Sequence, residues 1–133
     1  MSDGVVVDTS ALVALLLDEP DKPRLLDALL EGRPRWLSSL SLLEAHVVIS
    51  KLLGPAGVVD LDALLLRANI EVIAFGAEHA LLARQAWDAF GKGRHPAQLN
   101  LGDCCAYALA RHAGFRLLAK GDDFPKTDVQ LAT

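Results

Sequence analysis

Acidic side chains stand at four separated points of the sequence where strands are expected to end or helices to begin. Asp8 follows a β-branched run, Glu44 and Asp103 lie where two helices should start, and Asp122 and Asp123 follow a later apolar run. Carboxylates brought together repel one another, so such a group either takes up protons or binds a hard divalent cation. A bound Mg²⁺ or Mn²⁺ ion would acidify water and stabilise charge on phosphorus, which is the chemistry of phosphodiester hydrolysis.

Each acid taken alone also has a purely structural interpretation. Asp8 can serve as a turn or capping carboxylate for the next helix. Glu44 stands three residues after Ser41 and Asp103 three after Asn100, which is the spacing of a capping box. The last two acids fit a polar turn. Their conjunction favours a shared site, because in parallel sheets functional groups gather beyond the carboxyl ends of the strands.

Short apolar runs alternate with segments of helical periodicity along the whole chain. Strands are expected at 4–8, 35–38, 71–75 and 116–119, with a further edge strand at 128–131. Helices are expected at 10–19, 21–31, 41–53, 58–68, 77–90 and 101–113. The pattern predicts a three-layer α/β/α fold with a mainly parallel central sheet of four to five strands, formed by residues 1–133 as one domain.

Helix ends are expected at particular polar residues and glycines. Ser10, Ser41 and Asn100 are predicted N-caps, because a short polar side chain there can accept a hydrogen bond from a free backbone N–H. Gly32 is expected to end its helix in the left-handed conformation. Trp87 lies at helical spacing with apolar neighbours and is expected in the core, as are Trp36 and Tyr107.

Composition narrows the class of protein. The chain has 133 residues, of which 52% are hydrophobic and 23% charged, as in compact domains. Its net charge of −4 argues against nucleic-acid binding unless the acids are concentrated in a metal site and the bases lie around its rim. Cys104 and Cys105 are adjacent, so we expect free thiols and a cytoplasmic protein. We expect no signal peptide and no membrane segment.

Four motifs together indicate a known family. They are VVVDTSALVAL around Asp8, SSLSLLEA around Glu44, GKGRHPAQLNLGDC ending beyond Asp103, and LLAKGDDFPKTD with Asp122 and Asp123. In their order and spacing the chain resembles the PIN-domain family and, within it, the VapC ribonuclease toxins of type II toxin–antitoxin systems. The resemblance covers nearly the whole chain.

The resemblance implies a Mg²⁺- or Mn²⁺-dependent endoribonuclease with Asp8, Glu44, Asp103 and Asp123 as its catalytic acids. Asp8, Asp103 and Asp123 would hold the metal, with Asp8 and Asp103 as direct ligands, while Glu44 and Asp123 would act through water. Asp123 is preferred to Asp122 because the acid that precedes the phenylalanine matches the family pattern. Which of these two acids points inward stays open.

The resemblance also implies an RNA substrate, a small cognate antitoxin and a homodimer. We expect Ser10 to support the metal-binding carboxylate or its water. Lys92 and Arg94, with His95 in the same Gly-rich loop, and Lys120 near the last acids, are candidates for gripping phosphates. The antitoxin could dock on apolar residues of the first two helices, which could equally be ordinary core: Leu12, Leu15, Leu16, Leu25, Leu26 and Leu29.

Two other functions use the same residues. One is a metal-dependent phosphatase or a DNA-directed nuclease, and the other is a binding module whose acid cluster is inactive. A phosphatase with an aspartate nucleophile would want a second acid two residues after Asp8, where Ser10 stands instead. Neither the RNA target nor the number of metal ions follows from the sequence.

Overall fold

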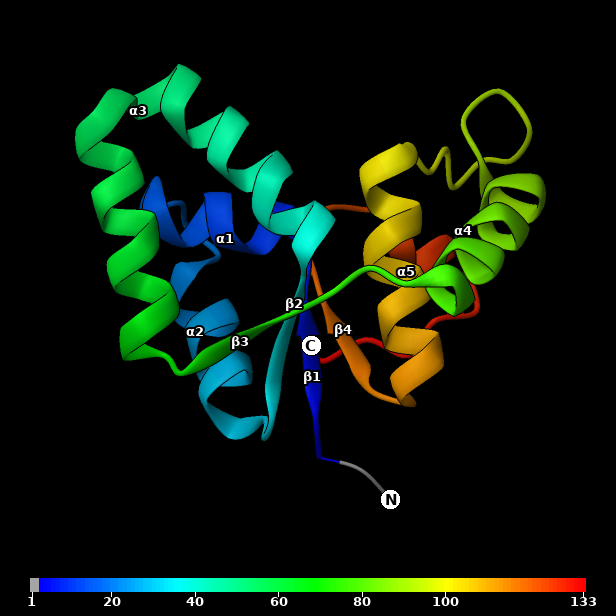
Figure 1. Ribbon diagram of the computed structural model, residues 1–133, viewed down its shortest axis with the longest axis horizontal. Coiled ribbons are helices and arrows are strands. Elements are labelled where there is room, and N and C mark those ends of the chain that lie inside the picture. Colours follow the sequence, from blue (N-terminus) through cyan, green and yellow to red (C-terminus); the bar gives the residue numbers. More distant parts are fainter. Residues whose placement is uncertain (1–2) are drawn as a thin grey trace.

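A parallel sheet of four strands forms the centre of the molecule, seen in a computed structural model that describes residues 3–133 (Figure 1). Its strands are β1 (Val5–Val7), β2 (Arg35–Ser38), β3 (Ile70–Ile73) and β4 (Arg116–Leu118), in the spatial order β3-β2-β1-β4. β1 runs parallel to β2 and β4, and β2 runs parallel to β3. The carboxyl ends of all four strands therefore lie at the same edge of the sheet.

Helices cover both faces of this sheet. They are α1 (Thr9–Leu16), α2 (Lys22–Glu31), α3 (Ser39–Arg67), α4 (Ala77–Phe90) and α5 (Leu101–Ala113), with a 3₁₀ turn η1 (Phe124–Lys126). Figure 1 shows α1, α2 and α3 on one side and α4 and α5 on the other. This confirms the predicted three-layer α/β/α fold. The edge strand expected at 128–131 is absent from the described residues, where only an isolated bridge joins Leu131 to Leu117.

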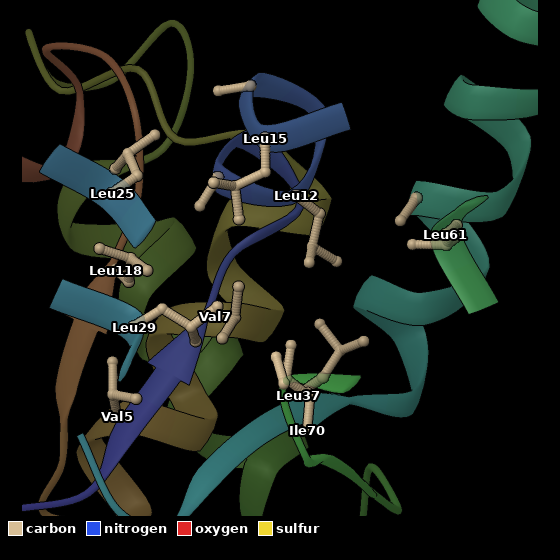
Figure 2. Close-up of a cluster of buried hydrophobic side chains, with 14 residues drawn as sticks. Val5, Val7, Leu12, Leu15, Leu25, Leu29, Leu37, Leu61, Ile70 and Leu118 are labelled. Carbon is tan, nitrogen blue, oxygen red and sulfur yellow. The ribbon is translucent and has the colours of Figure 1, made fainter. Parts of the chain in front are cut away.

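The side chains on the two faces of the sheet form two separate apolar cores. Alternate residues of β1 contribute to the two cores: Val5 and Val7 pack on the α1–α3 side and Val6 on the α4–α5 side. Figure 2 shows the first core, where leucines of α1 and α2 pack over β1. Four of the leucines that we considered as an antitoxin groove are buried there, so they are ordinary core: Leu12, Leu15, Leu25 and Leu29.

α3 combines two helices that the sequence predicts separately. Gly54 interrupts it with φ 68°, a left-handed conformation that glycine adopts without strain, and Pro55 follows. By length and composition α3 is apolar enough to cross a membrane, with 17% of its most apolar stretch buried. Because Gly54 divides it, neither half reaches the roughly 20 residues that a membrane-spanning helix needs.

The N-caps of α1 and α3 both lie two to three residues earlier than predicted. Asp8, not Ser10, is the N-cap of α1, and its carboxylate accepts a hydrogen bond from the backbone N–H of Ser10. Ser38, not Ser41, caps α3. The capping box that would have explained Glu44 therefore does not form. Asn100 caps α5 as predicted.

The end of α2 also differs from its prediction. Gly32 is extended, with φ −81° and ψ 145°, rather than left-handed. The guanidinium of Arg35 supplies the reason, because it donates hydrogen bonds to the carbonyls of Leu29, Leu30 and Gly32 at 2.8, 2.8 and 3.0 Å. The free carbonyls of the last turn are thus satisfied by a side chain instead of by a reversed backbone.

Candidate active site

Asp8 lies at the carboxyl end of β1 and at the start of α1. Its backbone N–H donates to the carbonyl of Leu118 in β4, which completes the strand pairing. Oδ2 accepts hydrogen bonds from the backbone N–H and the hydroxyl of Ser10, at 3.0 and 2.6 Å. The side chain is 2% exposed. One oxygen of this carboxylate therefore caps the helix, and the other takes no part in the cap.

The second oxygen of Asp8, Oδ1, is buried and has no hydrogen-bond partner within the described chain. Burial raises the pKa of Asp8 from 3.8 to about 7, and repulsion from Asp103 and Glu44 adds to the shift against the lowering effect of Ser10. A buried carboxylate oxygen without a partner costs free energy. The site is therefore incomplete without a proton or an external cation.

Asp103 is held in the first turn of α5 by reciprocal hydrogen bonds with Asn100. The backbone N–H of Asn100 donates to Oδ2 of Asp103 at 3.0 Å, and Oδ1 of Asn100 accepts from the backbone N–H of Asp103 at 2.8 Å. The capping-box interpretation is thus correct for this acid. Burial raises the pKa of Asp103, and repulsion from Glu44 and Asp123 raises it further.

Glu44 reaches the site from the second turn of α3. Its carboxylate lies against Gly102, where an added Cβ would come within 2.2 Å of Oε2. Only a glycine at this position of α5 lets Glu44 approach so closely. Its charge contributes to the raised pKa of both Asp8 and Asp103.

Asp122 and Asp123 are both exposed in the loop after β4. Asp123, and not Asp122, is among the groups that raise the pKa of Asp103. Asp123 also directly precedes the turn η1, whose Phe124 is buried in the core and anchors the loop. Its effect on Asp103 and its place before the anchored turn support Asp123, rather than Asp122, as a candidate member of the acid group.

The residues present fit a divalent cation that is held partly through water. Among residues 3–133, no three Asp, Glu, His or Cys side chains are grouped closely enough to enclose a metal ion by themselves. Mg²⁺ needs no such cage, since it is usually bound by one or two carboxylates and several waters. The unpartnered Oδ1 of Asp8 and the mutual repulsion of the surrounding carboxylates match that requirement.

Two of the remaining predicted site residues occupy different surroundings. Ser10 joins the acid group to the loop after β4, because its hydroxyl donates to Asp8 and accepts from the backbone N–H of Lys120 at 3.0 Å. The ammonium of Lys120, however, pairs with Glu19 and lies 3.8 Å from Asp21. Its charge is already committed to carboxylates, which weakens the case for Lys120 as a phosphate contact.

Lys92 and Arg94 extend from the exposed loop between α4 and α5. Backbone hydrogen bonds from Lys92 to Leu99 and from Arg94 to Gly91 shape this loop. Within residues 3–133, neither side chain forms an ion pair or a hydrogen bond. Both cations are therefore available to an external anion.

Two features of this region could not be read from the residue pattern. Ser41 is completely buried, and its hydroxyl has no hydrogen-bond partner in the described part of the chain. Trp87, expected in the core, is 36% exposed and lines a cavity of about 650 Å³. Trp36 is partly buried against the second core, and Tyr107 is buried there.

Comparison with known proteins gives the same picture along the whole chain. The family model described as the PIN domain matches residues 5–130. Ribonuclease VapC of Mycolicibacterium smegmatis is 47% identical over 125 residues, which cover 94% of this chain and 97% of that protein. Ribonuclease VapC30 of Mycobacterium tuberculosis is 46% identical over 125 residues, covering 94% and 95%. The DNA-bound VapBC structure from Salmonella typhimurium matches with a TM-score of 0.76 at 17% identity, covering 96% and 95% of the two chains.

Proposed function

The chain belongs to the PIN-domain family and, within it, to the VapC ribonucleases, and we propose that it is a Mg²⁺-dependent endoribonuclease acting as the toxin of a toxin–antitoxin pair. The observation that supports the metal dependence is the buried, unpartnered Oδ1 of Asp8, a carboxyl group that Asp103 and Glu44 also repel. Residues 1–133 would act as one PIN domain. Mn²⁺ would serve in place of Mg²⁺, because both prefer oxygen ligands.

The acids divide the work according to their surroundings. Asp8 and Asp103 would be direct ligands, because both are held rigidly at helix starts. Asp123, in the exposed loop after β4, would hold the ion through water. Glu44, which lies against the backbone of α5, would orient or deprotonate the attacking water. When bound, the metal ion supplies an acidified water and stabilises charge at phosphorus.

The substrate and the partner contact different parts of the surface. Lys92 and Arg94 would attract RNA phosphates, since their charges are unpaired within the described residues. Exposed apolar side chains of α3, rather than the core leucines of α1 and α2, would meet the antitoxin or a second copy of the chain: Leu43, Val47, Leu52, Val59 and Leu66. Buried free thiols at Cys104 and Cys105 are consistent with a cytoplasmic location.

Cleavage assays on RNA test this function. The purified chain should cleave RNA with Mg²⁺ or Mn²⁺ and stop in EDTA. Asp8→Asn and Asp103→Asn should each lower kcat/KM by more than about 100-fold, because even the outer partners of metal ligands typically contribute 10–100-fold. Asp60→Asn, which removes an exposed carboxylate of α3, is the matched control and should keep full activity.

Parallel substrates separate this function from its alternatives. DNA and a phosphomonoester should be cleaved much more slowly than RNA under the same conditions. Cleavage that persists in both aspartate variants, after contaminating nucleases are excluded, would contradict the assignment. Coexpression with a cognate VapB-like antitoxin should give a complex in which cleavage is suppressed.

A further inference from the structure

The cavity lined by Trp87 opens between α4 and the starts of α3 and α5 and has a volume of about 650 Å³. This is the size of a small-molecule site rather than of a groove for a whole helix. Cys104 and Ala83 are buried residues that line it, whereas Trp87 and Leu101 are 36% and 78% exposed. The cavity is thus open to solvent, with a mainly apolar floor that includes Ala83 and Cys104.

The cavity and the acid group share the same two helix starts. Asn100, which lines the cavity, exchanges hydrogen bonds with Asp103 in the first turn of α5. Leu40, another lining residue, lies one turn before Glu44 on α3. A chain whose phosphate reaches Asp103 and Glu44 therefore passes beside the mouth of this cavity.

The cavity is lined by aromatic rings and by polar side chains, some of which have no hydrogen-bond partner in the described chain. Trp87 and Phe75 supply rings, and Arg84 and Asp88 supply one donor-rich and one acceptor group. Across residues 3–133, the side chains of Arg84, Trp87 and Asp88 form no hydrogen bond or ion pair with the rest of the chain. Unpaired RNA bases are recognised by this combination, in which a ring stacks on the base and polar groups read its edge.

We propose that this cavity holds one unpaired base of the RNA, next to the phosphate that is cleaved. The inference rests on the proposed ribonuclease function and deepens it by naming a recognition subsite. Trp87 stacks on the base, while Arg84 and Asp88 contact its edge. Lys92 also lines the cavity and neutralises the adjoining phosphate.

The test replaces one nucleotide at a time in a single-stranded RNA by an abasic nucleotide and measures binding in EDTA, where cleavage is stopped. For the native chain, one abasic position should weaken binding by roughly 5- to 100-fold, as expected from the loss of one stacked base. In Trp87→Ala that position should no longer matter, while intact RNA binds correspondingly less tightly. Trp87→Phe should restore most of the difference.

Control variants separate recognition from folding. Leu81→Ala changes an exposed residue of α4 that does not line the cavity and should bind like the native chain. Arg84→Gln and Asp88→Asn change exposed residues, so they should fold even if Trp87→Ala does not. At the position found with abasic RNA, each should alter the preference among the four bases by about 5-fold or more.

The outcomes are distinct for this subsite and for the ribonuclease function. An RNA that loses the same affinity at every abasic position in native chain and variants alike overturns the subsite, even if Mg²⁺-dependent cleavage persists. A change from dimer to monomer in Trp87→Ala, with base preference unchanged, would make the cavity part of an interface and also overturn it. Absence of cleavage by the native chain contradicts the ribonuclease instead, whatever the binding data show.

Discussion

Two buried ionisable side chains lie at opposite ends of neighbouring strands, Arg35 at the start of β2 and Asp8 just after the end of β1. They differ in how many of their polar atoms form hydrogen bonds. Arg35 begins β2 and is 7% exposed, and its guanidinium donates four hydrogen bonds to carbonyls of Leu29, Leu30, Gly32 and Ala68. Asp8 follows β1 and is 2% exposed, but one of its oxygens has no partner in the described chain. The chain itself supplies hydrogen-bond partners for the Arg35 guanidinium, whereas one carboxyl oxygen of Asp8 has none in the described residues.

This difference separates a structural charge from a functional one. Arg35 lies where α2 and α3 end, and the partial negative charge of helix C-termini favours a cation there. Asp8 receives two hydrogen bonds through Oδ2, yet two further carboxylates repel it. A chain that leaves a buried carboxylate in this state gives up stability at that point. That loss is explained if a cation completes the site during function.

The largest change in stability is expected when the hydrogen bonds of Arg35 are removed. Arg35→Met removes the guanidinium and leaves buried carbonyls at the ends of two helices without a donor, so it should lower the free energy of unfolding by about 3–5 kcal/mol. Arg116→Met is the matched control, because Arg116 begins β4, pairs with the same Val5 and is exposed. Urea unfolding checks both, and equal losses would contradict the role of Arg35.

A smaller effect is expected in the pH dependence of stability, which depends on Asp8. Without metal, the native state keeps a proton on Asp8 up to a pH of about 7, whereas the unfolded chain releases it near 3.8. The native state thus binds more protons between these values, so stability should fall as pH rises from about 4 to 7, by at most about 4 kcal/mol. Asp103, whose pKa is also raised, acts in the same direction.

Asp8→Asn should flatten much of this pH dependence, because the side chain no longer titrates. Urea unfolding at a series of pH values in EDTA provides the measurement. Asp60→Asn, an exposed acid on α3, should retain the pH dependence of the native chain. A stability that rises with pH across this interval in the native chain would show that Asp8 is not held protonated.

Metal should reverse that loss. Mg²⁺ binds the ionised carboxylates, so it should stabilise the native state most above pH 7, by about 2.7 kcal/mol at a concentration of 100 Kd. Melting temperatures with and without Mg²⁺ at pH 5 and pH 8 measure the effect. The Asp8→Asn and Asp103→Asn double variant should show no such gain, and an equal gain in it would place the ion elsewhere.

The smallest effect sharpens the account of Asp8 itself. Ser10→Ala removes the hydroxyl that donates to Asp8 and accepts from Lys120, and should lower stability by about 1 kcal/mol. Because this hydrogen bond lowers the pKa of Asp8, its loss should move the midpoint of the pH dependence upward. Ser50→Ala, which removes only a local bond to Val47, should leave that midpoint in place.

The sequence predicted elements well where local patterns decide them. The runs around β1, α4 and α5 have the right type and nearly the right bounds, because their apolar spacing and the cap at Asn100 are local features. The N-caps of α1 and α3 were predicted two to three residues too late, because two short polar residues close together can both cap: Asp8 and Ser10 before α1, Ser38 and Ser41 before α3. The expected strand at 128–131 reduced to one bridge.

What the sequence determined by itself is the kind of chemistry and the order of its parts. Acids placed after strands and at helix starts must gather at one edge of a parallel sheet, and their spacing identifies the family. Only the tertiary structure decided which oxygen of Asp8 stays unpartnered, that Arg35 joins two helix ends, and that Trp87 borders a cavity. Each depends on groups far apart in the chain, and burial and pairing of a side chain are set by whatever folds around it.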